Sequence, residues 1–459
     1  MDNIFFLTSF LPLVLAAHWL VPGTKSKNAV LLVFSLLFYS FGSLSSLVLL
    51  IGVALINYLL GLALKQGRCK KVALAAGLVL DIGFLAFFKY ADFLLSGILG
   101  ESALQSTLAV PLGISFFTFK CISYLMDAYR DGAQATGSFS HLLLYVSFFP
   151  QITMGPITRF REFAPQLEER CVSVEDTARG LRRFAAGLGK KILIAGIAAS
   201  VADGVFALEQ VDIRLAWAGA IAYCIQLYFD FSGYIDMVIG LGSCFGFATR
   251  ENFNYPYTAV SIGGFWRRWH MSLSTWFKDY LYIPLGGNRK GKFRAGINKS
   301  IVFLLCGLWH GAAWTFVVWG LWHGLFSLLE SMNVIPEKRF ETGKGRIVGH
   351  IYTLLVVCVG FVMFRATDVA QGLQIIAAMF TGFRFTAAGT VALHRLLNVQ
   401  TVLAMAAGAA LSMPLSQKLA ARLGKYADSL SCIGALAVLV LCIIKMAAGN
   451  FAPSIYAQF

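Results

Sequence analysis

Apolar runs long enough to cross a lipid bilayer recur from one end of this chain to the other. A transmembrane helix needs about 20 predominantly apolar residues. Inside lipid, backbone groups find hydrogen-bond partners only in helices or closed barrels, so apolar runs of this length predict helices. About eleven candidate spans are expected, at 4–22, 28–46, 47–64, 72–98, 108–126, 180–207, 214–246, 297–330, 348–365, 399–421 and 430–449.

Composition supports the same fold class. The mean hydropathy is +0.71 and only 13% of the residues are charged, whereas soluble domains carry about 25% charged residues. The sequence therefore predicts an all-α polytopic membrane protein in which residues 1–459 form one domain. Shorter apolar stretches at 139–158 and 369–382 are expected to be re-entrant or interfacial helices. The first run lacks a basic segment and a small-residue cleavage site, so it is interpreted as a retained span.

The net charge of +15 is interpreted as a membrane signal. Basic residues gather in short loops, and such loops tend to stay on the cytoplasmic side of a membrane. The clusters around Lys25 and Lys70 are separated by two candidate spans and an uncharged link at 42–46. This order predicts that the link and the N-terminus lie outside. The lipid bilayer is the predicted partner, and no nucleic-acid partner is expected.

The nine cysteines form no metal or redox framework. They are scattered singly without a Cys-x-x-Cys pair, and most lie in apolar runs, where a free cysteine behaves as a small hydrophobe. The sequence contains no phosphate-binding glycine loop, no His-Glu-x-x-His motif and no dinucleotide fingerprint. We therefore expect no bound metal and no ATP-driven work.

Two histidines occupy membrane-like surroundings. His270 lies in a stretch rich in tryptophan and arginine, and His310 lies in a long apolar run. An ionisable group in lipid is costly, and histidine exchanges a proton near neutral pH, so both are candidates for a functional site. The polar and aromatic stretch 250–299 predicts short helices that dip into the protein from the cytoplasmic side. His270 is then expected at the wall or mouth of a tunnel.

Glycines flank His310 at Gly307 and Gly311, and the same pattern returns at 320–324. Small residues four apart let helices approach closely in lipid, and residues three or four apart share a helix face. His310 is therefore expected to face a helix interface. On a continuous helix, His323 would lie about 220° around and roughly 20 Å along from His310, so the two could share a site only if the helix breaks.

Several motifs, taken together, resemble one family. They lie at 111–119, 148–151, 154–159, 226–234, 266–279, 307–324 and in the tail 455–459. In this order and spacing the chain resembles the membrane-bound O-acyltransferase family, and within it the bacterial alginate O-acetylase-like branch. Lys278 and Ala457 depart from the usual residues of that branch, and neither touches the expected chemistry.

The resemblance implies a helical fold around a central tunnel, in a bacterial cytoplasmic (inner) membrane. It implies an O-acetyltransferase that passes an acetyl group from a cytoplasmic donor, acetyl-CoA or an acyl-carrier thioester, across the membrane to an extracellular or cell-envelope polysaccharide. A separate periplasmic or extracellular acetyltransferase partner is also implied. His310 matches the catalytic histidine and would act as general base, and His270 matches the second site position. Transfer would be direct or by covalent relay.

Other residues near the motifs are candidates for supporting roles. No bound cofactor is expected, and a basic rim would suit an anionic acyl donor. The donor-binding candidates are Arg267, Arg268, Trp269 and Lys278. The candidates for support or gating of the site are Tyr228, Asp230, Ser232, Arg159, Trp309 and His323.

Other interpretations remain open. A lone histidine in a span is often an interhelical hydrogen-bond partner, which is favoured for His323, and an interfacial histidine such as His270 can serve as an anchor. The same fold could transfer D-alanine or another acyl group to teichoic acid or peptidoglycan. A transporter or channel would also keep intramembrane histidines and glycine breaks, although no inverted repeat is recognisable.

Overall fold

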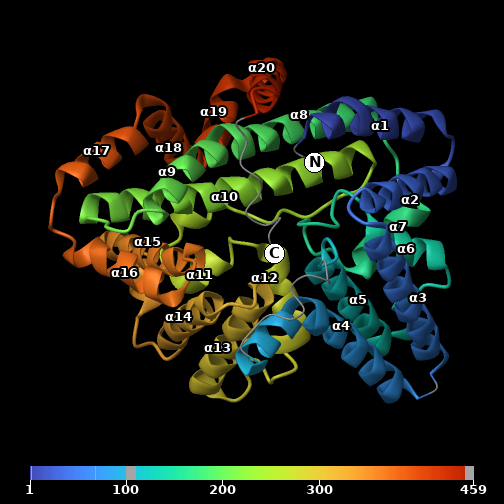
Figure 1. Ribbon diagram of the computed structural model, residues 1–459. Helices are drawn as coiled ribbons and strands as arrows, with labels where there is room; N and C mark the ends of the chain where they lie inside the picture. Colours follow the sequence, from blue (N-terminus) through green and yellow to red (C-terminus); the bar gives the residue numbers. More distant parts are fainter. Residues whose placement is uncertain (2, 68, 100–109, 450–459) are drawn as a thin grey trace. The chain divides into compact units, whose positions relative to one another are not determined.

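The computed structural model describes residues 1–459 except 2, 68, 100–109 and 450–459, so the tail motif at 455–459 lies outside the described residues (Figure 1). Throughout the described ranges every regular element is a helix, as predicted, and no β-strand is present. The chain divides into two compact units. Unit 1 comprises Met1–Phe184 and Met237–Arg250, and unit 2 comprises Ala185–Asp236 and Glu251–Phe459. One domain over 1–459 stays a prediction.

Unit 1 is a set of helices joined by short turns. Helix α3 shows why its residues start and stop a helix: the Ser43 side chain accepts a hydrogen bond from Ser46 N at its start, and Gly67 adopts φ 80° at its end. The elements are η1 (Phe6–Phe10), α1 (Leu11–Leu20), α2 (Thr24–Ser40), α3 (Leu44–Gln66), α4 (Lys70–Leu99), α5 (Ile114–Arg130), η2 (Gly132–Gln134), α6 (Phe139–Ser147), α7 (Phe160–Glu168) and the first part of α8 (Val174–Gly189).

Unit 2 contains the rest of α8 and most of α10 (Ile213–Cys244), together with everything after residue 250. The stretch 250–299 forms the predicted short helices up to residue 282, as η4 (Pro256–Thr258), α11 (Ile262–Trp266), α12 (Met271–Phe277) and η5 (Lys278–Tyr282), but residues 291–299 begin a longer helix. Entry of these helices from the cytoplasmic side stays a prediction. The other elements are η3 (Lys190–Ala195), α9 (Gly196–Phe206), α13 (Gly291–His310), α14 (Trp314–Ser331), η6 (Glu337–Phe340), α15 (Gly343–Arg365), α16 (Val369–Thr381), α17 (Ala387–Leu396), α18 (Val399–Leu411), α19 (Leu415–Leu423), η7 (Gly424–Tyr426) and α20 (Ala427–Ala447).

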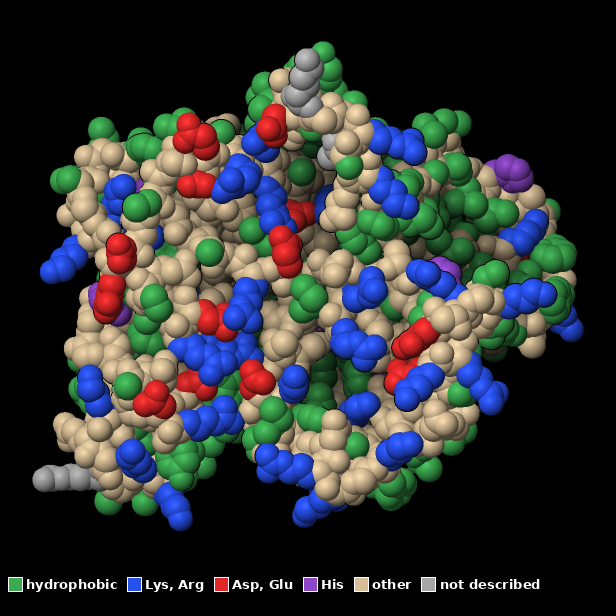
Figure 2. Space-filling model, turned by 180° about the vertical axis from the view of Figure 1, so that it is seen from behind, with side chains coloured by type: hydrophobic (Ala, Val, Ile, Leu, Met, Phe, Trp, Pro, Cys, Tyr) green, Lys and Arg blue, Asp and Glu red, His purple; other side chains and the backbone are tan. Residues whose placement is uncertain are grey.

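Membrane character is visible in length, composition and surface. Among the described helices, five stretches are long and apolar enough to cross a bilayer: Leu44–Gln66, Lys70–Ala91, Val174–Phe206, Gly343–Arg365 and Ala427–Ala447. A sixth arises if α18 and α19, bent by 73°, form one span. The expected number of about eleven stays a prediction. Large apolar side chains such as Leu20 and Val399 are exposed, and Figure 2 shows apolar side chains on the surface beside groups of Lys and Arg.

The expectation of a single span at 297–330 is wrong. The run forms α13 and α14, which are separated by a break after His310 and pack against each other (Figure 1). The predicted close approach of the glycine motifs is confirmed within this pair. A Cβ atom on Gly307 would overlap the carbonyl oxygen of Phe316, and one on Gly320 would lie 2.6 Å from the carbonyl oxygen of Phe303. Hydropathy cannot detect a hairpin whose two arms are both apolar.

Adding a methyl group at Gly307 is expected to destabilise this hairpin. Gly307→Ala would force the backbones of α13 and α14 apart, at a cost of about 1–3 kcal/mol in the free energy of unfolding. The measurement is denaturant unfolding of the purified protein in mixed micelles. Gly434→Ala is the matched control, because a Cβ atom at Gly434 meets nothing within 4 Å. Equal stability of both variants would contradict close packing at Gly307.

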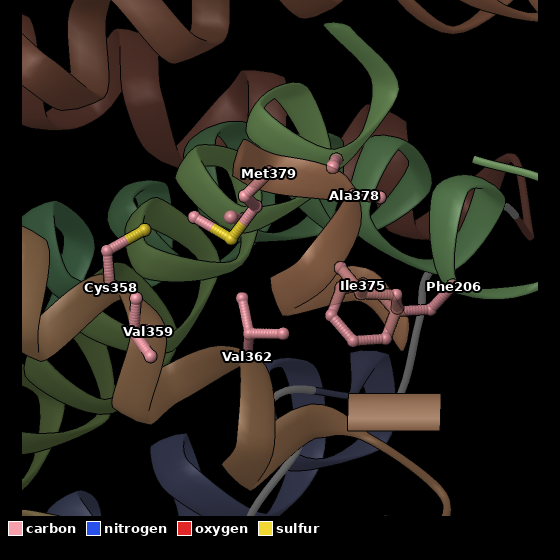
Figure 3. Packing of buried hydrophobic residues seen from close by; sticks show 9 residues of the cluster. Phe206, Cys358, Val359, Val362, Ile375, Ala378 and Met379 are labelled. Carbon is pink, nitrogen blue, oxygen red and sulfur yellow. The ribbon is translucent and has the colours of Figure 1, made fainter. Parts of the chain in front are cut away.

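A buried apolar cluster holds the helices of unit 2 that border the candidate site. It joins Phe206 of α9 and Ala216 of α10 to residues of α15 and α16, including Val362 and Met379 (Figure 3). Burial of apolar surface of this kind is the main favourable term for packing these helices against each other. The cluster therefore fixes α10 and α15, and both contribute side chains to the cavity that contains the histidines.

Candidate active site

His270 and His310 line the same cavity, which has a volume of about 140 Å³ and lies within unit 2. The break after His310 ends α13 at this cavity, and the left-handed backbone before α12 brings His270 to it. Apart from the histidines and Ser274, the lining is apolar or aromatic. It comprises Leu227, Trp266, Trp269, Leu273, Phe277, Val302, Phe303, Cys306, Trp319, Phe361 and Phe364.

His310 is the last residue of α13 and is 5% exposed. Its ring centroid lies 5.1 Å from that of Phe364 on α15 and 5.4 Å from that of Trp319 on α14. Rings from two other helices therefore hold the imidazole, which supports the expectation that it faces a packed helix interface.

His270 is held by Asn252. The backbone of His270 has φ 45°, an uncommon conformation for a residue with a Cβ atom, and such conformations persist where the surroundings impose them. The Asn252 amide lies 3.3 Å from Nδ1 of His270, and its Oδ1 accepts a hydrogen bond of 2.8 Å from Ser272 N. The Asn252 carbonyl accepts another from Met271 N at 3.0 Å. These contacts fix both the ring and the start of α12.

The second ring nitrogen of His270, Nε2, is buried without a hydrogen-bond partner from the described parts of the chain. The imidazole also packs edge-on against Phe231 at 4.7 Å between centroids. Trp309 connects the two histidines, since its ring lies 4.9 Å from that of His310 and 6.3 Å from that of His270. One indole thus contacts both imidazoles.

His323 does not line the cavity but packs against two of the tryptophans that do. It is fully buried, and neither ring nitrogen has a hydrogen-bond partner in the part of the chain that the structure describes. Its ring packs against Trp266 at 5.0 Å and Trp319 at 5.1 Å, and both tryptophans line the cavity. Because the helix breaks, His310 and His323 both contact Trp319, a neighbourhood that a continuous helix would forbid.

The residues predicted to support the site lie in several different places. Tyr228 packs against Trp269 at 5.9 Å, next to the cavity. Asp230 instead forms a buried ion pair with Lys191 of η3. Ser232 is buried, and its hydroxyl has no hydrogen-bond partner among the described residues. Arg159 belongs to unit 1, as the residue before α7, and its supporting role stays a prediction.

Of the donor-binding candidates, only Trp269 lines the cavity with the histidines. Arg267 and Arg268 line a separate polar cavity of about 340 Å³, and Lys278 is exposed at the start of η5. Donor binding by these residues stays a prediction. Within the described ranges, no three His, Cys, Asp or Glu side chains lie close enough together to hold a metal ion.

Asn252 and Lys191 were not predicted as site residues. Asn252 stands in a polar stretch with several similar residues, and nothing in that stretch distinguishes it. Lys191 carried a stronger signal, because a lysine inside an apolar run must find a partner. Its partner, Asp230, was a candidate for a different reason, and only the packing of η3 against α10 joins the two.

Comparison with known proteins agrees with this architecture. The sequence model of the membrane-bound O-acyltransferase family matches residues 31–367. A probable alginate O-acetylase of Pseudomonas aeruginosa is 40% identical over 393 residues, covering 82% of this chain and 74% of that protein. A peptidoglycan O-acetyltransferase of Helicobacter pylori is 36% identical over 413 residues, covering 82% and 78%.

A more distant relative carries a different acyl group. A teichoic acid D-alanyltransferase of Bacillus subtilis is 32% identical over 274 residues, covering 55% of this chain and 68% of that protein. The family match spans most of the chain and includes both cavity histidines. The apolar helices and this match make the protein a multi-pass membrane acyltransferase. As its motifs predicted, the chain belongs to the membrane-bound O-acyltransferase family.

Proposed function

We propose that this protein transfers an acetyl group from a thioester donor, acetyl-CoA or an acyl-carrier thioester, to a hydroxyl group of an extracellular or cell-envelope polysaccharide. The observation that carries the proposal is the pair of histidines on one small, mainly apolar cavity. The relatives named for O-acetylation of alginate and peptidoglycan support the acetyl group and the polysaccharide acceptor.

His310 acts as the general base in this proposal. A ring nitrogen takes the proton of the acceptor hydroxyl while the oxygen attacks the thioester carbonyl, a role that contributes about 10²- to 10⁴-fold to rate. The new C–O bond forms, the C–S bond breaks, and the proton passes to the departing thiol. The products are the acetyl ester and the free thiol. The apolar lining keeps competing water away from the thioester.

His270 acts as a hydrogen-bond donor to the carbonyl oxygen. Both amide atoms of Asn252 lie near Nδ1 of His270, the nitrogen at 3.3 Å and Oδ1 at 3.4 Å, and in this proposal the amide nitrogen donates to Nδ1. An Nδ1 that accepts places the ring proton on Nε2. Nε2 is buried and has no hydrogen-bond partner among the described residues, so in this proposal it stabilises the oxyanion of the tetrahedral intermediate.

The proposal also assigns the donor and the acceptor to opposite sides of the membrane. We place the donor on the cytoplasmic side of a bacterial inner membrane, where basic clusters such as 289–294, at the start of α13, would attract an anionic thioester. The N-terminus lies outside. The acceptor lies across the membrane, and a separate periplasmic or extracellular acetyltransferase completes delivery to the polysaccharide.

Proteoliposomes supplied with radiolabelled acetyl-CoA test this function. Wild-type protein should release the free thiol and transfer the labelled acetyl group to an acceptor, to water or to the protein itself. The His310→Ala variant should leave acetyl-CoA intact. Consumption of carrier-bound D-alanine in place of acetyl-CoA would assign the D-alanyl activity instead. If wild-type protein leaves both acetyl-CoA and carrier-bound D-alanine intact, the proposed donor is wrong and the acyl group comes from another source.

Replacing His270 with alanine is expected to lower the rate of transfer by about 10²- to 10³-fold, the usual loss when one oxyanion donor is removed. Asn252→Leu should lower the rate less, because the ring stays but loses its orientation. The rate constants of both variants are measured in the same proteoliposomes. His394→Ala is the control, since His394 is exposed on α17 and its Nδ1 lies 2.9 Å from the carbonyl oxygen of Thr390 on the same helix. Wild-type rates for His270→Ala would rule out the donor role.

A further inference from the structure

A second, larger cavity lies in unit 2 and shares no lining residue with the one that contains the histidines. It is an apolar groove of about 860 Å³ bordered by α10, α15 and α18. Large apolar side chains in it are open to the surroundings: Ile347 is 64% exposed, Ile351 61% and Ile221 45%. Filling such a groove with water is unfavourable, so in a bilayer it will hold an apolar chain.

One end of the groove is positively charged. The polar cavity of about 340 Å³ shares Thr258, Val260 and Arg346 with the groove, so the two spaces are adjacent. Arg267 and Arg268 complete a set of three arginines, against two glutamates in the same lining, which leaves one net positive charge. In the part of the chain that the structure describes, none of these arginines forms an ion pair within 4.0 Å.

The groove has the depth of one membrane leaflet. Arg346 lies in the first turn of α15, a candidate span, and the groove follows this helix from Arg346 to Cys358. At about 1.5 Å per residue this distance is about 18 Å. Half the hydrocarbon core of a bilayer is about 15 Å thick. An arginine at the first turn of a span stands at the level of the lipid phosphates, and the groove below it reaches as far as an acyl chain does.

We propose that an anionic phospholipid occupies this composite site. Its phosphate lies between Arg346 and the pair Arg267 and Arg268, and one acyl chain lies in the groove between α15 and α10. A zwitterionic lipid fills the groove, but the net positive charge contributes less to its binding free energy. A free phosphate ester has no acyl chain, so the groove contributes nothing to its binding. This proposal does not rest on acetyl transfer and goes beyond it.

Native mass spectrometry of the delipidated, purified full chain tests the site. Dioleoyl phosphatidylglycerol should bind at one site more tightly than dioleoyl phosphatidylcholine. Arg346→Ala should weaken phosphatidylglycerol binding about fivefold, the usual contribution of one basic side chain near anionic lipid. Ile351→Trp should abolish binding by filling the groove, and its 61% exposure leaves room for the larger ring without disturbing the core.

Matched controls keep the test specific. Arg339→Ala removes an exposed arginine just outside the cavity, and Leu373→Trp adds a ring at an exposed position of α16, so both should bind as wild type does. Equal affinity for the two lipids together with unchanged binding by Arg346→Ala would overturn the proposal. Full displacement of the lipid by millimolar glycerol 3-phosphate would also overturn it, in favour of a simple phosphate site.

Discussion

Replacing His310 with alanine is expected to lower acetyl transfer by about 10²- to 10⁴-fold, the usual contribution of a general base. The variant removes the ring nitrogen that would take the proton of the acceptor hydroxyl. Folding should persist, because Trp319 and Phe364 still pack against each other at 5.4 Å between ring centroids. The measurements are the initial rate of labelled transfer in proteoliposomes and the midpoint of thermal unfolding.

Two further variants make this result specific to proton transfer. His310→Gln keeps a polar side chain of similar size without a comparable base, so it should be as inactive as alanine. His394→Ala, on the exposed helix α17, should retain the wild-type rate. Substantial transfer by either His310 variant, in protein with a normal unfolding midpoint, would show that another group acts as the base.

Replacing Lys191 with alanine is expected to cost about 3–5 kcal/mol in the free energy of unfolding, because it leaves a buried carboxylate without its cation. The side chain of Lys191 is 1% exposed and that of its partner Asp230 is 7% exposed. Transfer should fall as well, since the residue after Asp230 is Phe231, whose ring packs on His270 at 4.7 Å. Denaturant unfolding in mixed micelles measures the loss in the free energy of unfolding.

The adjacent lysine provides the matched control. Lys190 pairs with Asp236 at 2.6 Å, but its side chain is 32% exposed, so water can solvate a stranded partner. Lys190→Ala should therefore cost clearly less than Lys191→Ala. The double variant Lys191→Met with Asp230→Leu should recover most of the stability, because apolar residues of similar volume often replace a buried ion pair without loss. Equal losses at both lysines would refute burial as the cause.

The amino-acid sequence determined the fold class and the two principal candidates. Apolar runs too long and too weakly charged for a soluble domain require helices in lipid, and ionisable groups within them are rare enough to attract attention. The motifs around His270 and His310 added the family, and the glycine pattern at 307–324 predicted a close helix contact that the packing of α13 on α14 confirms.

Tertiary structure alone decided how those residues meet. The apolar run containing His310 folds back on itself, which brings both His310 and His323 against the ring of Trp319. Packing also joined Lys191 to Asp230 and separated Arg267 from the cavity of the histidines. Hydropathy records how apolar a segment is. It carries no information on where a chain reverses or which distant side chain compensates a buried charge, because both depend on contacts between helices far apart in sequence.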